Sequence, residues 1–360
     1  MAVTKEYKCP CCGGEIQFDP NSQKMKCPYC LTEFEVATLN EYYEDMGKIQ
    51  KEDEIQWDES NLKEWEEDEA TGLRVYKCNS CGGEVFGDDT LAATKCPYCG
   101  SPVVLEGQFR GDLKPEIVIP FKLDKSVAIQ RLKEETKKKK FIPNAFKAQV
   151  DEIKGIYIPF WLFDSKVDAN VTFKATKERR WSDNNYDHEE IKYYQVIRDG
   201  SVEFSKVPVN GSSKIEDKIM ESVEPFETKD ETDFETYYLA GYLADRYDES
   251  VEQSKPRAVE RCKNGVIEEF RRSIAGFDSV TYEDGTFTST DGKIRYAMYP
   301  VWLMSCKWED KIYQFAMNGQ TGRFVGDFPI DKGKSIRFLI RSMLLCCAAA
   351  LAIAWLIQKF

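Results

Sequence analysis

The hydrophobic positions between residues 113 and 330 form short runs rich in Val, Ile, Phe, Tyr and Trp, which predict β-strands. Two stretches instead show the spacing of amphipathic helices. The first is capped by Asp124 or Ser126, and the second opens at Pro256. Their apolar positions are Ala128, Ile129 and Leu132 in the first, and Val259, Cys262, Val266, Phe270 and Ile274 in the second. The pattern predicts an α+β body over residues 113–330.

Two strands of this body resemble each other, IYIPFWLFD at 156–164 and AMYPVWLMS at 297–305. Each follows a Pro-Phe segment that precedes a helix, IPFKLD near Phe121 and EPFETK near Phe226. The echo suggests two related halves that have diverged through insertions. We expect Trp161 and Trp302 to anchor the core rather than line a peptide groove. Residues 313–329 carry the turn signals of a hairpin.

The longest apolar stretch is FLIRSMLLCCAAALAIAWLI at 338–357, whose 20 positions would span about 30 Å as a helix. Arg341 is its one charged residue, and the segment 331–337 before it is basic. The pattern predicts a transmembrane helix over 338–357, with the membrane bilayer as a binding partner. The positive-inside rule would place the preceding residues in the cytoplasm, as in a single-pass membrane protein. The alternative is a buried or interfacial helix.

A repeat at an offset of 69 residues dominates the N-terminal third. YKCPCCGGE at 7–15 returns as YKCNSCGGE at 76–84, and KCPYC at 26–30 returns as KCPYC at 95–99. Each copy has two C-x-x-C pairs separated by 14 residues. This spacing is typical of zinc ribbons, in which two knuckles hold one metal ion. We predict ribbon 1 over residues 1–39 and ribbon 2 over residues 73–112.

The expected ligands are eight thiolates, arranged as two closed tetrahedra around two structural Zn²⁺ ions. Iron can occupy four thiolates as well. Cys11 competes with Cys12 for ribbon 1, but its counterpart in ribbon 2 is Ser80, so the repeat favours Cys12. The predicted metal ligands are Cys9, Cys12, Cys27 and Cys30 in ribbon 1 and Cys78, Cys81, Cys96 and Cys99 in ribbon 2.

Acidic residues gather between the ribbons. Residues 41–69 contain 13 Asp or Glu against three Lys, and the whole chain has a net charge of −12. We interpret residues 40–72 as an acidic linker, a mobile spacer. This charge opposes attraction to nucleic-acid phosphates, so nucleic-acid binding is possible in principle but not favoured. The first ten residues hold a cysteine motif where a secretory signal would need an apolar stretch.

Catalytic patterns are hard to find in this sequence. His188 is the single histidine and has no accompanying Ser or Cys motif. Gly333-Lys334-Ser335 resembles the end of a phosphate-binding loop, but the glycine that the motif requires five positions earlier is Phe328. We therefore predict a protein that is not an enzyme, with no catalytic or nucleotide-binding residues.

The ribbons, the Pro-Phe segments, the aromatic-proline strands, the FAMNGQTG turn and the C-terminal apolar segment follow one another in this order. In this order they resemble the YdjG-type zinc-ribbon membrane proteins of bacteria, over nearly the whole chain. Such proteins are often labelled as TFIIB-type zinc-ribbon proteins, or as relatives of the primosomal replication-restart helicase. This sequence lacks a complete phosphate-binding loop, so only zinc binding would transfer from the helicase label. The resemblance implies phage-shock protein A and an SPFH-type membrane scaffold as partners in an envelope-stress response.

The functional expectation is a membrane-tethered adaptor whose ribbons bind protein partners at the cytoplasmic face. The alternative is an accessory protein of replication or transcription that binds nucleic acid through its ribbons. Counting over residues 1–36 gives four Lys against five Asp or Glu, a weak electrostatic footprint for that alternative.

Overall fold

The computed structural model describes residues 8–11, 14–20, 22–48, 54–66, 72–88, 95–108, 113–143, 153–183, 186–308 and 311–359. The chain divides into two compact units. Unit 1 takes residues 1–58, 163–207 and 257–293, and unit 2 takes 59–162, 208–256 and 294–360. Both units draw on strands β9 (Lys154–Ser182), β10 (Asp187–Asn210) and β13 (Ser279–Trp308) and on helix α5 (Val251–Arg272).

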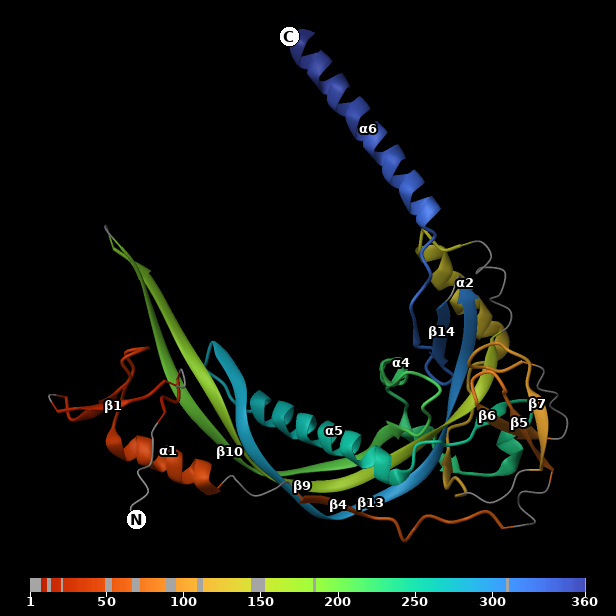
Figure 1. The fold of residues 1–360 in the computed structure, drawn as a ribbon, viewed down its shortest axis with the longest axis horizontal. Coiled ribbons are helices and arrows are strands. Elements are labelled where there is room, and N and C mark those ends of the chain that lie inside the picture. The colour runs from red at the N-terminus through yellow and green to blue at the C-terminus, as the bar shows by residue number, and fades with distance from the viewer. Residues whose placement is uncertain are drawn as a thin grey trace. The chain divides into compact units, whose positions relative to one another are not determined.

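The fold is mostly β, with 43% of the described residues in strands and 27% in helices, so the α+β prediction is wrong. The difference comes from strand length. β9 has 29 residues, β10 has 24 and β13 has 30, and Figure 1 shows β9 and β10 running side by side as one long hairpin. The sequence suggested several shorter strands in their place.

Asp-Gly pairs explain why the strands look shorter in the sequence, because such pairs are turn signals. The pairs ending at Gly200, Gly285 and Gly292 all lie inside strands. A Cβ added at Gly285 would lie 3.0 Å from the carbonyl oxygen of Asn170, and one added at Gly292 would collide with Trp57. These two glycines therefore allow close approach of a neighbouring chain segment and do not mark turns.

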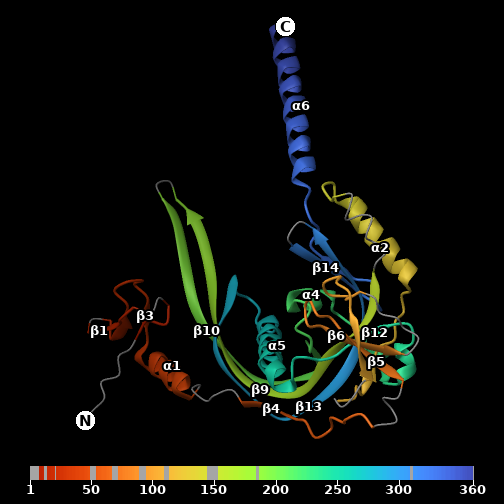
Figure 2. The ribbon, with the colours of Figure 1, turned by 45° about the vertical axis from the view of Figure 1, so that its right-hand side comes forward.

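Unit 1 begins with a three-stranded antiparallel sheet, β1 (Gln17–Asp19), β2 (Lys24–Lys26) and β3 (Glu33–Phe34), followed by helix α1 (Val36–Lys48). Strand β4 (Glu54–Asp58) then pairs in parallel with β13. In this unit α5 packs on β10: Phe270 lies over Gly200, and Phe204 lies against Gly265. Figure 2 shows α5 beside β10.

The segment predicted to be an acidic spacer contains structure of its own. Its strand β4 includes the buried Trp57, whose ring packs 5.0 Å from that of Phe163. The Trp57 indole also donates a hydrogen bond of 3.1 Å to the carbonyl oxygen of Asp164. An aromatic anchor of this kind holds residues 54–58 in place, so this part of the segment is not a mobile spacer.

Unit 2 is built on strands in the order β11-β8-β13-β9-β12-β6-β5-β7, with β14 paired to β13 and β15 paired to β14. The bounds are β5 Leu73–Lys77, β6 Glu84–Asp88, β7 Val104–Gln108, β8 Ile117–Val118, β11 Thr232–Asp233, β12 Leu243–Asp245, β14 Lys311–Asn318 and β15 Phe324–Gly326. The helical elements are α2 Lys125–Lys138, α4 Asp217–Val223, η2 Thr228–Asp230, η3 Thr236–Leu239 and α6 Lys332–Lys359. The hairpin predicted over 313–329 is confirmed by the antiparallel pairing of β14 with β15.

Both predicted helices of the body form. Asp124 caps α2 by accepting a hydrogen bond of 2.9 Å from the backbone N–H of Val127, as predicted. Helix α5 begins at Val251 and contains Pro256, so the predicted start at Pro256 is wrong. Ser250 and Gln253 form a reciprocal capping box that starts the helix earlier.

The two aromatic-proline strands make matching contacts within unit 2. Trp161 and Trp302 are buried, as predicted. The Trp161 indole donates to the carbonyl oxygen of Glu249 at 3.0 Å, and the Trp302 indole donates to that of Leu123 at 2.9 Å. Each acceptor lies just before a helix, α5 in one case and α2 in the other.

The strand after each aromatic-proline strand ends at an Asn that is followed by a Gly. The hydrogen bonds of these two turns match as well. The N–H of Gly211 donates to Pro159, and the N–H of Gly319 donates to Pro300. Each glycine carbonyl then accepts two N–H bonds from a segment that leads into a helix, residues 248–249 for Gly211 and 122–123 for Gly319. The counterpart of the segment near Phe121 is therefore 243–250, and not the EPFETK segment.

Helix α6 contains the predicted membrane segment. Among the helices that the structure describes, none combines the length with the apolar character that crossing a bilayer requires. The predictions of a transmembrane helix over 338–357, a juxtamembrane segment at 331–337 and a single-pass membrane location are therefore wrong. Arg341 is expensive to place in hydrocarbon, and the alanines of the segment add little apolar area.

Candidate metal centres

Ribbon 2 is assembled from two tight turns carried on three strands. Strand β5 leads into the first knuckle, where the N–H of Cys78 donates to Gly83 and the N–H of Gly82 donates to Cys78. The second knuckle repeats this pattern between Cys96 and residues 100–101, and β7 follows it. Gly82 and Gly100 have φ values of 71° and 73°, a left-handed conformation that glycine adopts without strain. Because β5 pairs with both β6 and β7, the two knuckles face each other.

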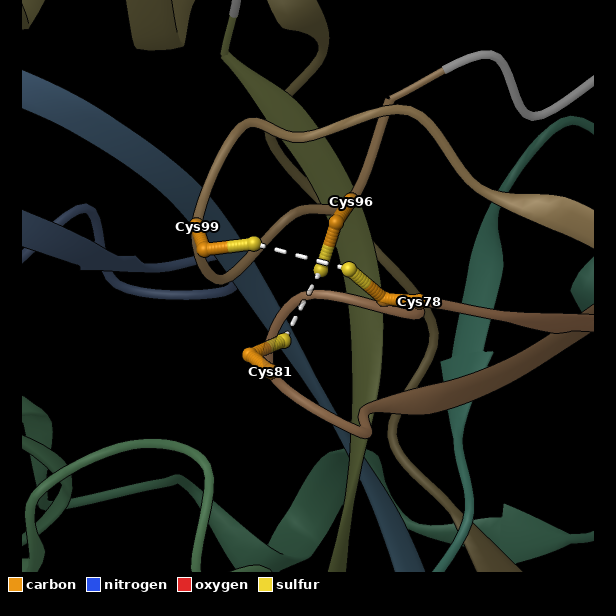
Figure 3. A group of neighbouring side chains, drawn as sticks. All are labelled: Cys78, Cys81, Cys96 and Cys99. Atoms are coloured by element: carbon orange, nitrogen blue, oxygen red, sulfur yellow. Dashed lines mark hydrogen bonds between the residues drawn. The ribbon is translucent and has the colours of Figure 1, made fainter.

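The four predicted sulfurs of ribbon 2 meet at one point, as Figure 3 shows. The Sγ atoms of Cys78 and Cys99 are 3.5 Å apart, those of Cys81 and Cys96 are 3.6 Å apart, and all four lie within 4.8 Å of one another. Zn–S bonds of about 2.3 Å in a tetrahedron would put the sulfurs roughly 3.8 Å apart. The cluster therefore has the dimensions of a four-thiolate metal site and could hold a metal ion.

The metal-free thiols differ in their acidity. Burial raises the pKa of Cys96 far above its ordinary value and also raises the pKa of Cys81. Burial alone would raise the pKa of Cys99 too, but hydrogen bonds from the hydroxyl and N–H of Ser101, together with the neighbouring Cys78 and Cys81 thiols, outweigh it and lower that pKa to about 7. Since a metal binds thiolates, loading the site at neutral pH must release protons.

Ribbon 2 is part of the core of unit 2. Cys78, Cys96 and Tyr98 are buried in the same hydrophobic cluster as Ile158 and Leu303 of the long strands. Strand β6 also pairs with β12, which continues the sheet into the ribbon. The metal site thus lies against the body, and its loss would expose apolar surface there.

Three side chains of the body contact the second knuckle. The Ser305 hydroxyl donates to the carbonyl oxygen of Pro97 at 2.7 Å, and the Gln314 amide donates to that of Tyr98 at 3.3 Å. The Tyr98 hydroxyl faces the carboxylate of Asp245, which is 1% exposed. Burial raises the pKa of Asp245 to about 7.

These contact residues were not predicted. The repeated KCPYC motif did mark Tyr98, but as part of a knuckle and not as a contact with the body. Nothing in the local sequence of Asp245, which lies in LADRYDES, distinguishes it from surface carboxylates. In the matching segment of the other half, the position of Asp245 is occupied by the buried Ile119. Only the match between the two halves in the structure reveals that the Asp245 carboxylate occupies a core position.

Ribbon 1 brings together the three predicted ligands that lie among the described residues. Cys9, Cys27 and Cys30 have their sulfurs within 4.8 Å of one another, with 3.5 Å between Cys9 and Cys30. Cys12, the fourth predicted ligand, lies outside the described residues. A small core of Cys9, Cys27, Ile16 and Leu39 supports the site. This cluster could also hold a metal ion.

Cys11 lies beside this cluster. It is half-buried, and burial raises its pKa, with a hydrogen bond to Thr32 acting in the opposite direction. Its carbonyl oxygen accepts a hydrogen bond of 2.6 Å from the Lys174 ammonium. Cys11 is thus held by its surroundings in unit 1 while Cys9 and Cys30 share the cluster.

Three further residues with polar or charged side chains lie elsewhere. His188 is in β10, where its ring stacks on Trp181 and its Nε2 lies 2.8 Å from the Asp183 carboxylate. Lys138 ends α2 and pairs with Glu135 on the same helix. Lys334 lies at the start of α6, where Asp331 accepts from its N–H. None of these three belongs to either cysteine cluster.

The fold and sites define a class of protein: a mostly β chain that carries two cysteine clusters of metal-binding geometry. The chain is 31% identical to a Bacillus subtilis protein described as uncharacterized protein YdjG, over 330 residues that make up 91% of each chain. The chain belongs to the YdjG family, which confirms this part of the resemblance seen in the sequence. No model of a known protein family matches it, and no solved structure does. The relations to TFIIB-type zinc-ribbon proteins and to the primosomal helicase are not confirmed.

Proposed function

We propose that this protein is a scaffold that binds protein partners and that each of its ribbons holds a structural Zn²⁺ ion. The observation that carries the proposal is the closed set of four sulfurs at Cys78, Cys81, Cys96 and Cys99. Four protein thiolates fill a tetrahedron and leave no position for water or substrate. Such a centre contributes folding free energy, on the order of 10 kcal/mol for small zinc domains. The proposal therefore assigns no catalytic role to the metal.

The resemblance described above supplies the first partners to test. These are phage-shock protein A and a scaffold of the SPFH class, acting in an envelope-stress response. The support for protein partners over nucleic acid is electrostatic. The net charge of the chain is −12, and such a chain gains little from contact with phosphates.

The zinc assignment is tested by the metal content of the purified full-length chain. We expect two zinc ions per wild-type chain, and one in each of Cys27→Ser and Cys96→Ser. Inductively coupled plasma mass spectrometry measures the number of metal ions per chain. Visible absorption identifies iron, because iron tetrathiolates are coloured and zinc sites are not. Two irons per chain would refute the zinc assignment, and a wild-type chain without metal would refute the structural role.

The scaffold role is tested by purification from gently crosslinked cells, with and without nuclease, followed by identification of the bound proteins. We expect partners that remain after nuclease treatment. Replication or transcription proteins that are lost after nuclease would contradict the proposal and favour nucleic-acid binding. A chain that purifies alone under both conditions would also contradict it.

A further inference from the structure

The two ribbons share the same second knuckle but differ in what covers it. Both read Lys-Cys-Pro-Tyr-Cys. In ribbon 2, Pro97 is buried and Tyr98 is 2% exposed, whereas in ribbon 1 Pro28 is exposed and Tyr29 is 74% exposed. One chain therefore contains a covered copy and an uncovered copy of one motif, and the covered copy shows what such a knuckle binds.

The cover of the ribbon 2 knuckle, which we call the socket, consists of Ser305, Gln314 and Asp245. Two neutral side chains donate to the carbonyl oxygens of the Pro-Tyr pair, and a buried carboxylate faces the tyrosine hydroxyl. Apolar side chains of the same core cluster surround these contacts. The socket thus binds the backbone carbonyls through neutral donors and places a buried carboxylate beside the tyrosine.

The tyrosine of ribbon 1 is already held in the orientation that the socket accepts. A Cβ added at Gly14 would lie 2.5 Å from the Tyr29 ring, and one added at Gly83 would lie 2.8 Å from the Tyr98 ring. In both ribbons the ring therefore lies against the glycine of the first knuckle. Because Tyr29 keeps this position while exposed, binding it costs little side-chain entropy.

Leu31 gives the ribbon 1 knuckle an apolar residue that ribbon 2 lacks. It occupies the left-handed position of the knuckle with φ of 62°, where ribbon 2 has Gly100 with φ of 73°. This conformation costs a residue other than glycine roughly 1 kcal/mol or more. The Leu31 side chain is 69% exposed, so it recovers little of that cost by burial within ribbon 1. Burial of the Leu31 side chain in a complex with a partner would compensate for this conformational cost.

We infer that Tyr29 and Leu31 form the surface by which the chain docks on a separate protein. The docking face of that partner has the chemistry of the socket: neutral donors for the carbonyls of Pro28 and Tyr29, a buried carboxylate for the Tyr29 hydroxyl, and an apolar floor for Leu31. A second copy of this chain does not offer that face, because its own ribbon 2 fills the socket. This inference rests on the proposed scaffold function and names its docking element.

The experiment uses the full-length chain with the photo-crosslinking residue benzoylphenylalanine at position 31 and, as a matched control, at the exposed Val104 of ribbon 2. Illumination in cells followed by mass spectrometry identifies the protein and the residues that react at each position. We expect a partner that reacts at position 31 and not at position 104, at a face that contains Asp or Glu. Absence of such a product, or a product with a second copy of the chain, overturns the inference.

The dissociation constant of the identified partner then tests the chemistry. Leu31→Gly restores the residue of ribbon 2, so we expect ribbon 1 to retain its metal against a chelator at least as well as wild type, while the dissociation constant rises about tenfold or more. Tyr29→Phe should also weaken binding, and Tyr98→Phe should leave it unchanged. Equal affinity of wild type and Leu31→Gly would overturn the inference while leaving the scaffold function intact. Failure to recover any partner in the purification above would instead remove the scaffold function itself.

Discussion

Replacing Asp245 with Asn should make this protein less sensitive to rising pH. The Asp245 carboxyl is buried, and burial raises its pKa from an ordinary 3.8 to about 7. The nearby hydroxyls of Ser212 and Tyr98 lower the pKa and limit this rise, whereas the nearby charge of Asp248 adds to it. The folded protein therefore holds this proton more tightly than the unfolded chain does.

The sign and size of this change in the free energy of unfolding follow from proton linkage. Between pH 3.8 and about 7 the folded state binds more protons than the unfolded state, so the free energy of unfolding falls as pH rises through this window. Each pH unit between the unfolded and folded pKa values corresponds to about 1.4 kcal/mol, so the full penalty above the folded pKa is about 4 kcal/mol. About 2 kcal/mol of it is lost between roughly pH 5.5 and 8, a range open to measurement.

The assay is denaturant unfolding of wild type and Asp245→Asn from pH 5.5 to 8 at constant free zinc. Comparing the two chains cancels the pH dependence of the metal sites, which both share. We expect the difference in unfolding free energy to shift by about 2 kcal/mol in favour of the variant as pH rises. Asp230→Asn is the control, because the hydrogen bond from Lys122 holds the Asp230 pKa below its ordinary value, outside this range.

A difference between wild type and Asp245→Asn that stays constant from pH 5.5 to 8 would refute the reasoning. It would mean that Asp245 keeps an ordinary pKa in the folded protein. A wild-type chain that gains stability relative to the variant as pH rises would refute it more strongly.

The remaining predictions concern the ribbons and the matching halves. Cys12→Ser should release the metal of ribbon 1, whereas Cys11→Ser, which recreates the pattern of ribbon 2, should keep both metals; equal metal contents of the two variants would contradict the ligand assignment. Trp161→Phe and Trp302→Phe should each lower the free energy of unfolding by roughly 2 kcal/mol, because each leaves a carbonyl without its indole donor. If denaturant unfolding showed that one of these two variants is as stable as wild type, the match of the two halves would be wrong. Gly292→Ala should cost roughly 2 kcal/mol or more, since the added methyl collides with a buried tryptophan. An unchanged melting temperature would show that this strand tolerates the methyl.

Features fixed by short-range spacing could be predicted from the sequence. The C-x-x-C pairs and their 14-residue separation predicted the cysteine clusters, because a knuckle places its two sulfurs through local backbone geometry alone. The cap at Asp124 and the hairpin of β14 and β15 depend on a few neighbouring residues and were predicted for the same reason. The buried positions of Trp161 and Trp302 followed from their apolar surroundings.

Features that depend on long-range contacts could not be predicted. Asp-Gly pairs form turns in isolation, but Gly285 and Gly292 lie in continuous strands because neighbouring segments pack directly against them. The start of α5 depended on a capping box at Ser250 that the proline signal at Pro256 obscured. The apolar run before Ile357 formed a helix but not one fit to span a bilayer.

The two ribbons show most clearly what the sequence determined and what the tertiary structure decided. Their sequence alone determined two similar cysteine knuckles, each with a tyrosine between its cysteines. Tertiary structure decided that Tyr98 is buried against Asp245 while Tyr29 is exposed. The physical reason is that a knuckle closes on a metal through local geometry, whereas its burial depends on residues more than a hundred positions away in the chain.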